Sequence, residues 1–210
     1  MDKRLFITFE GPDGSGKTTI IKMVAKYLKN NNIDFVLTRE PGGSLIAEQI
    51  RNIILNPNNL ELSSTTEALL YAASRAQHFN EVIEPALMNN KLVLCDRFID
   101  SSLAYQGVAR GLGIDEVMEI NRFAIKDVLP DLTIFFDLDP IIGLNRINNS
   151  EFREINRLDL EEKAFHYQVY EGYLKIVKMY QKRFKVVDAH KPIEEVYNNV
   201  INIIMEQLNR

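Results

Sequence analysis

Residues 5–20, LFITFEGPDGSGKTTI, decide how the rest of the chain is interpreted. Residues 5–9 are leucine, aromatic or β-branched, which predicts a short buried strand. A glycine-rich turn, GPDGSGKT, follows at residues 11–18, and an apolar pattern of helical period begins near Lys17. A strand, this turn and a helix, in this order, are the context in which GxxxxGK[ST] predicts a phosphate-binding P-loop.

The residue types of this turn suit an anion. Glycine lets the backbone curl so that N–H groups point inward, and the following helix adds free donors and the positive end of its dipole. Lys17 supplies a cation for the β- and γ-phosphates, and Thr18 supplies a hydroxyl for Mg²⁺. We therefore expect ATP to be bound by the whole turn: Gly11, Pro12, Asp13, Gly14, Ser15, Gly16, Lys17, Thr18 and Thr19.

Length and composition limit the class of protein. The chain has 210 residues, which favours a single domain over residues 1–210. Its net charge of −4 offers no basic excess for nucleic acid or an anionic membrane. Cys95 is the only cysteine, so no internal disulfide is possible, and we expect it to be an ordinary buried residue. No signal peptide or run of 18 apolar residues is found, and a cytoplasmic location is expected.

Strand and helix patterns alternate along the chain. Strands are predicted at 5–9, 34–38, 92–95, 132–137 and 184–187, and helices at 18–30, 44–55, 64–90, 115–127, 141 onward, 160–183 and 193 onward. The run of residues 64–67, Ser-Thr-Thr-Glu, has the capping-box form, and Pro85 should kink or divide its helix. A helix is expected to start within 101–106, and a glycine-containing loop at 107–113. The pattern predicts a doubly wound α/β fold with helices on both faces of a parallel sheet.

Several polar side chains follow the predicted strands, and ligands of such sheets bind outside the carboxyl ends of the strands. Asp96 has the position of a Walker-B aspartate that holds Mg²⁺. Arg39 and Arg97 follow two strands, where guanidinium groups could hold an acceptor phosphate. Arg153 and Arg157 lie in an irregular stretch, about 148–158, that we expect to close over ATP as a lid.

Four motifs together resemble the bacterial thymidylate kinase family along essentially the whole chain. They are EGPDGSGKTT at 10–19, TREPGG at 38–43, DRFIDSS with YQG at 96–107, and PDLT at 130–133. The resemblance implies transfer of a phosphoryl group from ATP to dTMP, a P-loop nucleoside monophosphate kinase fold with a five-stranded parallel sheet, and a homodimer. It also implies that Tyr71 stacks on thymine and Arg75 bonds its O4, with Ser102 and Gln106 near the base edge. The i, i+4 spacing of Tyr71 and Arg75 places both on one helix face.

The resemblance also implies roles for the remaining site residues. Asp13 would contact the acceptor sugar and its neighbouring arginine, and Tyr105 would lie against the 2′ position of the sugar. Family members carry an arginine either in the P-loop or in the lid. Position 14 is glycine here, so Arg153 is the best lid candidate, with Arg146 and Arg157 left open. Adenine would lie against residues 189–192, a weaker match.

A phosphate acceptor also explains why no catalytic base stands out. The second pKa of a phosphate monoester is ~6, so the attacking oxygen is already anionic at pH 7. We assign no catalytic role to His78, His166 or His190, and expect catalysis to rest on Lys17, Asp13, Arg97 and Arg153.

The sequence disfavours three other classes of protein. A deoxynucleoside kinase would need a carboxylate base, for which Glu10 or Asp13 could serve, but the Arg39 and Arg97 pair argues against it. A GTP-dependent switch protein is disfavoured because the sequence has no Asn-Lys-x-Asp segment. The acidic balance and small size disfavour a DNA-acting ATPase.

Overall fold

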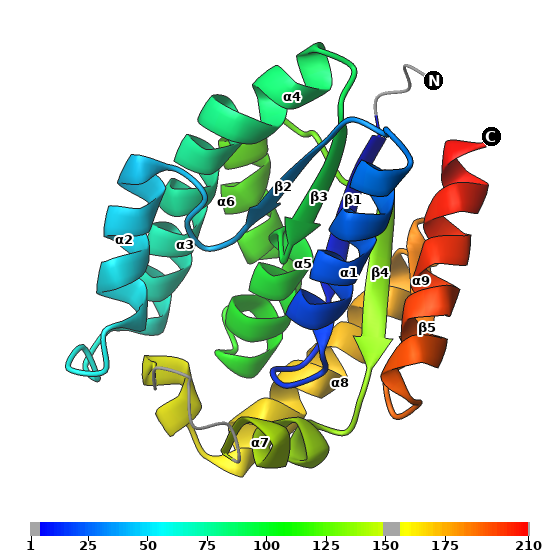
Figure 1. The fold of residues 1–210 in the computed structure, drawn as a ribbon. Coiled ribbons are helices and arrows are strands. Elements are labelled where there is room, and N and C mark those ends of the chain that lie inside the picture. The colour runs from blue at the N-terminus through cyan, green and yellow to red at the C-terminus, as the bar shows by residue number, and fades with distance from the viewer. Residues whose placement is uncertain (1–4, 149–155, 210) are drawn as a thin grey trace.

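The sheet has five parallel strands in the order β2-β3-β1-β4-β5 (Figure 1). The structure is a computed structural model that describes residues 5–148 and 156–209. Its strands are β1 Leu5–Glu10, β2 Phe35–Arg39, β3 Leu92–Asp96, β4 Leu132–Asp137 and β5 Phe184–Asp188. The predicted five-stranded parallel sheet is confirmed, and β1, which leads into the P-loop, is its central strand.

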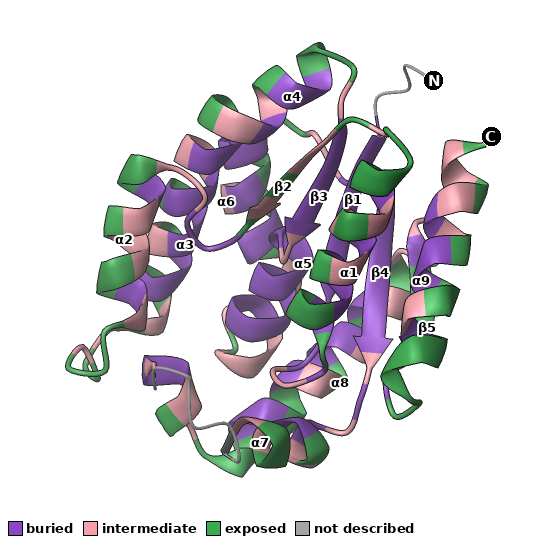
Figure 2. Cartoon of the chain, in the orientation of Figure 1, coloured by how far each residue is buried: buried purple, intermediate pink, exposed green. Residues whose placement is uncertain are grey.

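Helices cover both faces of the sheet, as predicted (Figure 1). The helices are α1 Lys17–Asn30, α2 Leu45–Leu55, α3 Ser64–His78, α4 Glu84–Met88, α5 Ile99–Ser102, α6 Ile114–Ile125, α7 Pro140–Asn148, α8 Lys163–Met179 and α9 Ile193–Leu208. Successive strand side chains point to opposite faces. Leu5, Ile7 and Phe9 therefore pack with α1 and α9, while Phe6 packs with the core that includes α6 and α8. The central strands are almost wholly buried (Figure 2).

The predicted helix at 64–90 is divided, as Pro85 suggested. A π-helical segment, Phe79–Ile83, separates α3 from α4, and Pro85 lies in the first turn of α4. The predicted capping box is wrong. The N-cap is Ser63, whose Oγ accepts from the Thr66 N–H at 3.2 Å, and Glu67 is buried in the core instead.

Two further predictions differ from the structure. Helix α5 starts at Ile99, and a π-helical segment, Leu103–Ala109, includes the first three residues of the loop expected at 107–113, whereas residues 110–113 do form a loop. Gly107 is buried in that segment, where a Cβ would lie 3.2 Å from the Gly113 carbonyl oxygen. The helix expected at 160–183 is α8, which begins later because Asn156 caps a separate 3₁₀ turn, Arg157–Leu160. Of the expected lid, residues 149–155 lie outside the described part.

Cys95 is fully buried, as expected. Among the described residues, none of the helices is both long enough and apolar enough to cross a membrane.

Candidate active site

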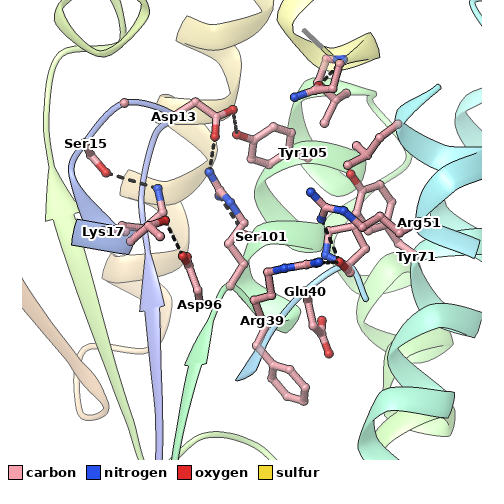
Figure 3. A pocket seen from close by; sticks show the side chains of 18 of the residues that line it. Asp13, Ser15, Lys17, Arg39, Glu40, Arg51, Tyr71, Asp96, Ser101 and Tyr105 are labelled. Carbon is pink, nitrogen blue, oxygen red and sulfur yellow. Dashed lines mark hydrogen bonds and ion pairs between the residues drawn. The ribbon is translucent and has the colours of Figure 1, made fainter. Parts of the chain in front are cut away.

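A cavity of about 550 Å³ lies at the carboxyl ends of β1, β2 and β3. Its walls come from the P-loop, the segments that follow β2 and β3, helix α3 and the π-helical segment Leu103–Ala109. Residues on either side of 149–155, such as Arg146 and Asn156, complete the walls. Figure 3 shows Lys17 and Asp96 at one end of this cavity and Tyr71, Arg51 and Arg39 at the other. The cavity therefore joins a phosphate-binding end to a second pocket lined by side chains.

The P-loop depends on glycine for both its shape and its packing. Gly11, Gly14 and Gly16 all have positive φ angles, of 143°, 74° and 88°. A Cβ at Gly14 would lie 2.1 Å from the carbonyl oxygen of Gly143 in α7. Position 14 therefore has no room for a larger residue, which gives a physical reason for a P-loop without arginine.

Lys17 is buried within the P-loop. Its Nζ donates to Gly11 O and Pro12 O, both at 2.8 Å, and to Ser15 Oγ at 3.2 Å. Burial, with the neighbouring Arg97 charge, lowers the pKa of Lys17 to about 8, although nearby carboxylates oppose the shift. The ammonium is thus held by neutral oxygens and is available to an anion.

Thr18 and Asp96 meet where the P-loop faces β3. Thr18 Oγ1 donates to Asp96 Oδ2 at 2.8 Å. A hydroxyl and a carboxylate are the hard oxygen ligands that Mg²⁺ prefers, with water and phosphate oxygens completing its shell. Within the described residues, no cluster of three or more His, Cys, Asp or Glu could hold a metal alone. The donor set fits a cation that arrives with its nucleotide.

Arg97 is held by side chains from three parts of the chain. Its backbone has a positive φ of 68°. Its guanidinium donates to Asp13 Oδ1 at 2.6 Å, Ser101 Oγ at 3.1 Å and the Tyr173 hydroxyl at 3.0 Å. Tyr105 donates to the other Asp13 oxygen at 3.1 Å. The structure thus brings the predicted residues Asp13, Arg97 and Tyr105 together. Tyr173 on α8 belongs to the same group but was not predicted from the sequence.

Glu10 lies behind this group. Its carboxylate accepts from Phe98 N at 2.7 Å, Ser101 Oγ at 2.6 Å and Tyr173 OH at 2.9 Å. Burial, and then the nearby Asp100 charge, raise the pKa of Glu10 to about 7. Glu10 is not part of the cavity wall, so it is badly placed to serve as the base of a nucleoside kinase.

Arg75 is almost fully buried on the cavity-facing side of α3. Its guanidinium donates to Glu40 Oε2 at 2.7 Å, Ser102 Oγ at 2.9 Å, Asn121 Oδ1 and the Phe98 carbonyl oxygen at 3.0 Å. These bonds use four of its five N–H groups. Arg75 is therefore fixed in place with one donor left, beside Tyr71 in the same wall.

Glu40, which anchors Arg75, also contacts a histidine. Its second oxygen lies 3.0 Å from His78 Nδ1, and His78 Nε2 lies 2.6 Å from Thr38 Oγ1. His78 thus supports the site from behind. His166 is also buried, while His190 is exposed.

Arg39 and Arg51 line the second pocket of the cavity. Arg39 is partly exposed and donates to Glu48 at 2.9 Å and to Pro41 O at 2.6 Å. Arg51 donates to the same carbonyl oxygen at 2.8 Å. Arg51 was missed from the sequence because it lies within α2 and does not follow a strand.

The three candidate lid arginines differ in position. Arg153 lies outside the described residues. Arg157 is buried, and donates to Ile54 O at 2.9 Å and Glu67 Oε2 at 2.5 Å. Arg146 lines the cavity and donates weakly to Gly14 O at 3.4 Å. Arg157 is thus held by Glu67 and does not line the cavity, whereas Arg146 does.

The fold and cavity define a P-loop nucleotide-binding α/β protein with a second pocket beside the loop. The family model "Thymidylate kinase" matches residues 9–200. A thymidylate kinase of Geobacillus sp. (strain WCH70) is 57% identical over 206 residues, 98% of each chain. One from Clostridium novyi (strain NT) is 56% identical over 200 residues, 95% of this chain and 98% of the relative.

A solved structure agrees with the sequence relatives. The crystal structure of thymidylate kinase from Ehrlichia chaffeensis matches with a TM-score of 0.77 and 37% identity, covering 97% of this chain and 99% of that one. The chain belongs to the thymidylate kinase family.

Proposed function

We propose that the protein transfers the γ-phosphoryl group of ATP to the phosphate of dTMP, giving ADP and dTDP on the way to dTTP. The observation that supports this most is the joined cavity, with the P-loop at one end and Tyr71, Arg75 and Arg97 at the other. Membership of the thymidylate kinase family points to the same substrates.

At the donor end, the P-loop N–H groups and the start of α1 hold the ATP phosphates. Lys17 moves from the neutral carbonyl oxygens of the loop to the β- and γ-phosphates, because charged oxygens form stronger hydrogen bonds with its ammonium group. Thr18 and Asp96 hold Mg²⁺, which neutralises phosphate charge when bound. Residues 189–192 follow β5 at the same sheet edge, within reach of adenine.

At the acceptor end, Arg97 and Arg39 hold the phosphate of dTMP, and Tyr71 stacks on the base. The remaining Arg75 donor bonds O4, while Ser102 orients the Arg75 guanidinium by accepting from it. Gln106 lines the pocket, and its carbonyl oxygen accepts from the N3–H of thymine. Among the described residues, this oxygen has no other hydrogen-bond partner. Asp13 and Tyr105 face the sugar, where Tyr105 disfavours a 2′-hydroxyl.

The transfer is an in-line displacement. A phosphate oxygen of dTMP forms the new bond to the γ-phosphorus, and the bond from that phosphorus to the bridging oxygen of ADP breaks. No proton has to be removed, because the attacking oxygen is already ionised at a pH above ~6. Lys17 and a lid arginine, Arg153 in this proposal, stabilise the charge on the transferred group. The chain acts as one domain whose lid, about 148–158, closes over ATP.

A homodimer fits the outer surface of the domain. Helices α2, α3 and α6 pack side by side and leave large apolar side chains exposed: Leu45 is 78% exposed, Leu69 52% and Phe123 92%. Exposed apolar surface of this kind marks protein interfaces. A Phe123→Asp substitution should shift the mass measured by light scattering from dimer to monomer, and an unchanged mass would remove this face from the interface.

The proposed reaction is tested by measuring ADP formation from Mg·ATP with dTMP, dUMP, dCMP, AMP, thymidine or no acceptor. Turnover that prefers dTMP supports both the reaction and the base pocket. Turnover with thymidine but not dTMP would indicate a nucleoside kinase and overturn the roles of Arg39 and Arg97. Hydrolysis of ATP that does not depend on an acceptor would contradict phosphoryl transfer to a nucleotide.

A further inference from the structure

Glu67 is a buried carboxylate that lies behind the acceptor pocket. It is on α3, one helical turn before Tyr71, is fully buried, and is not part of the cavity wall. Its oxygens accept from Gln106 Nε2 at 2.8 Å, Arg110 Nη2 at 3.1 Å and Arg157 Nη2 at 2.5 Å. None of these contacts is needed to cap α3, because Ser63 does that.

The carboxylate stays ionised in this environment. Burial alone would raise the pKa of Glu67, but the hydrogen bonds from Gln106 and Arg157 and the Arg110 charge together lower it. An ionised carboxylate accepts hydrogen bonds and donates none. The amide of Gln106 can therefore present only its NH₂ group to Glu67, since the flipped amide would place two oxygens against each other.

The consequence appears on the other side of the amide. Gln106 is 1% exposed, and its Oε1 has no hydrogen-bond partner in the part of the chain that the structure describes. Gln106 lines the acceptor cavity, as do Arg75 and Tyr71. A buried, unpaired carbonyl oxygen is costly unless a ligand supplies an N–H group. Thymine has such a group at N3, whereas cytosine has an acceptor there.

We propose that Glu67 is a positioning residue for base selection, which fixes Gln106 so that its Oε1 accepts from the ring N–H of thymine and opposes cytosine. This inference rests on the proposed function, because it concerns the acceptor of that reaction. Arg157 and Arg110 contribute by neutralising the carboxylate, so that it can remain buried next to the amide.

The test is the ratio of kcat/KM for dTMP to kcat/KM for dCMP. Glu67→Gln replaces a group that only accepts hydrogen bonds by an amide that can also donate. The amide of Gln106 can then turn over and donate its NH₂ group to N3 of cytosine. We expect the ratio to fall roughly tenfold or more. Glu61→Gln is the matched control, because it makes the same substitution at an exposed carboxylate that does not line the cavity, and should leave the ratio within about threefold.

A double-mutant cycle separates positioning from a general structural effect. In a Gln106→Leu background, Glu67→Gln should leave the remaining ratio unchanged, since Glu67 acts only through that amide. A wild-type ratio in Glu67→Gln, or an equal fall with and without Gln106, would overturn the inference. Thermal unfolding identifies variants that do not fold. If Glu67→Gln is one of them, Glu67→Asp carries the same test, because it keeps the charge but shortens the reach to the amide.

Failure of the proposed function gives a different result. It would appear in the wild-type protein, as an absence of dTMP-dependent ADP formation. Failure of the Glu67 inference alone leaves wild-type turnover of dTMP intact.

Discussion

The two ends of the cavity are built from different kinds of groups. The phosphate-binding part of the donor end is one short loop, in which Lys17 bonds to oxygens no more than six residues away. Asp96, 78 residues from Thr18, joins this part from a distant segment. The acceptor end uses buried side chains from distant parts of the chain, such as Arg97 with Asp13, 84 residues apart, and Arg75 with Glu40, 35 apart. A backbone loop suits any polyphosphate, whereas fixed side chains can select one base and one phosphate position.

The largest effect is expected at the donor end, from Lys17→Ala. The variant loses the only Lys or Arg side chain of the P-loop, and we expect kcat to fall by about 10³ or more, as for other lost transition-state contacts. Steady-state ADP formation with saturating dTMP measures this. Lys22→Ala, an exposed change on the same helix, is the control. Near-normal turnover of Lys17→Ala would remove the P-loop lysine from the mechanism.

The next effect is expected at the acceptor end, from Arg97→Lys. Lysine keeps the charge but cannot reproduce the fork that contacts Asp13, Ser101 and Tyr173, so kcat/KM for dTMP should fall about 100-fold. ADP affinity, measured by calorimetry, should stay within about twofold, because the two ends are built separately. The exposed Arg122→Lys serves as the control. An equal loss at both ends would show that the cavity works as one unit.

A smaller effect is expected from Arg153, where kcat and substrate affinity should respond differently. Arg153→Gln should lower kcat about tenfold to 100-fold while the affinity for dTMP is unchanged, because its charge contact forms only as the phosphoryl group moves. The parallel variant Arg146→Gln tests the arginine that lines the cavity. A normal kcat for Arg153→Gln together with a low one for Arg146→Gln would transfer the role to Arg146.

The pH dependence should also differ between the two ends. Burial lowers the pKa of Lys17 to about 8, so in the free protein the ammonium is lost as the pH rises through 8. Bound phosphates favour the charged form, so ADP affinity should be constant below pH 8 and fall up to about tenfold per pH unit above it. The affinity for dTMP should stay level from about pH 8 to 9, because the pKa of Arg97 is raised, and because Glu10, whose pKa is about 7, and the phosphate of dTMP are already ionised. Calorimetry across this range measures both, and a flat ADP curve would contradict the role of the Lys17 charge.

The strand–turn–helix unit of the P-loop could be predicted from the sequence because its parts are contiguous. The strand, the glycine turn, Lys17 and Thr18 lie within one stretch, and each follows a local rule. At the acceptor end, the resemblance to thymidylate kinases pointed to Tyr71 and Arg75, and their i, i+4 spacing agreed; both line the cavity. The residues that hold the site, such as Tyr173 on α8, carry no local signal because their partners are distant in sequence.

Glu67 shows why the remainder of the site was missed. The run Ser64–Glu67 fits a local capping rule, yet Ser63 already caps the helix, and the carboxylate instead pairs with Gln106, 39 residues away. The π-helical segment that carries Gln106 likewise has no distinctive pattern, because the bulky and small residues at 103–109 suit a loop equally well. In both places, tertiary contacts outweigh the local preference of the sequence.

We infer that the acceptor end is already assembled in the free protein. This can be measured by calorimetric titration of dTMP into the nucleotide-free protein, with dCMP as the matched ligand. If the pocket is preformed, dTMP binds with one site per chain and an affinity within about threefold of that measured with ADP present, while dCMP binds far more weakly. Binding of dTMP that appears only after ADP is added would contradict this inference, and would show that the donor end assembles the acceptor pocket.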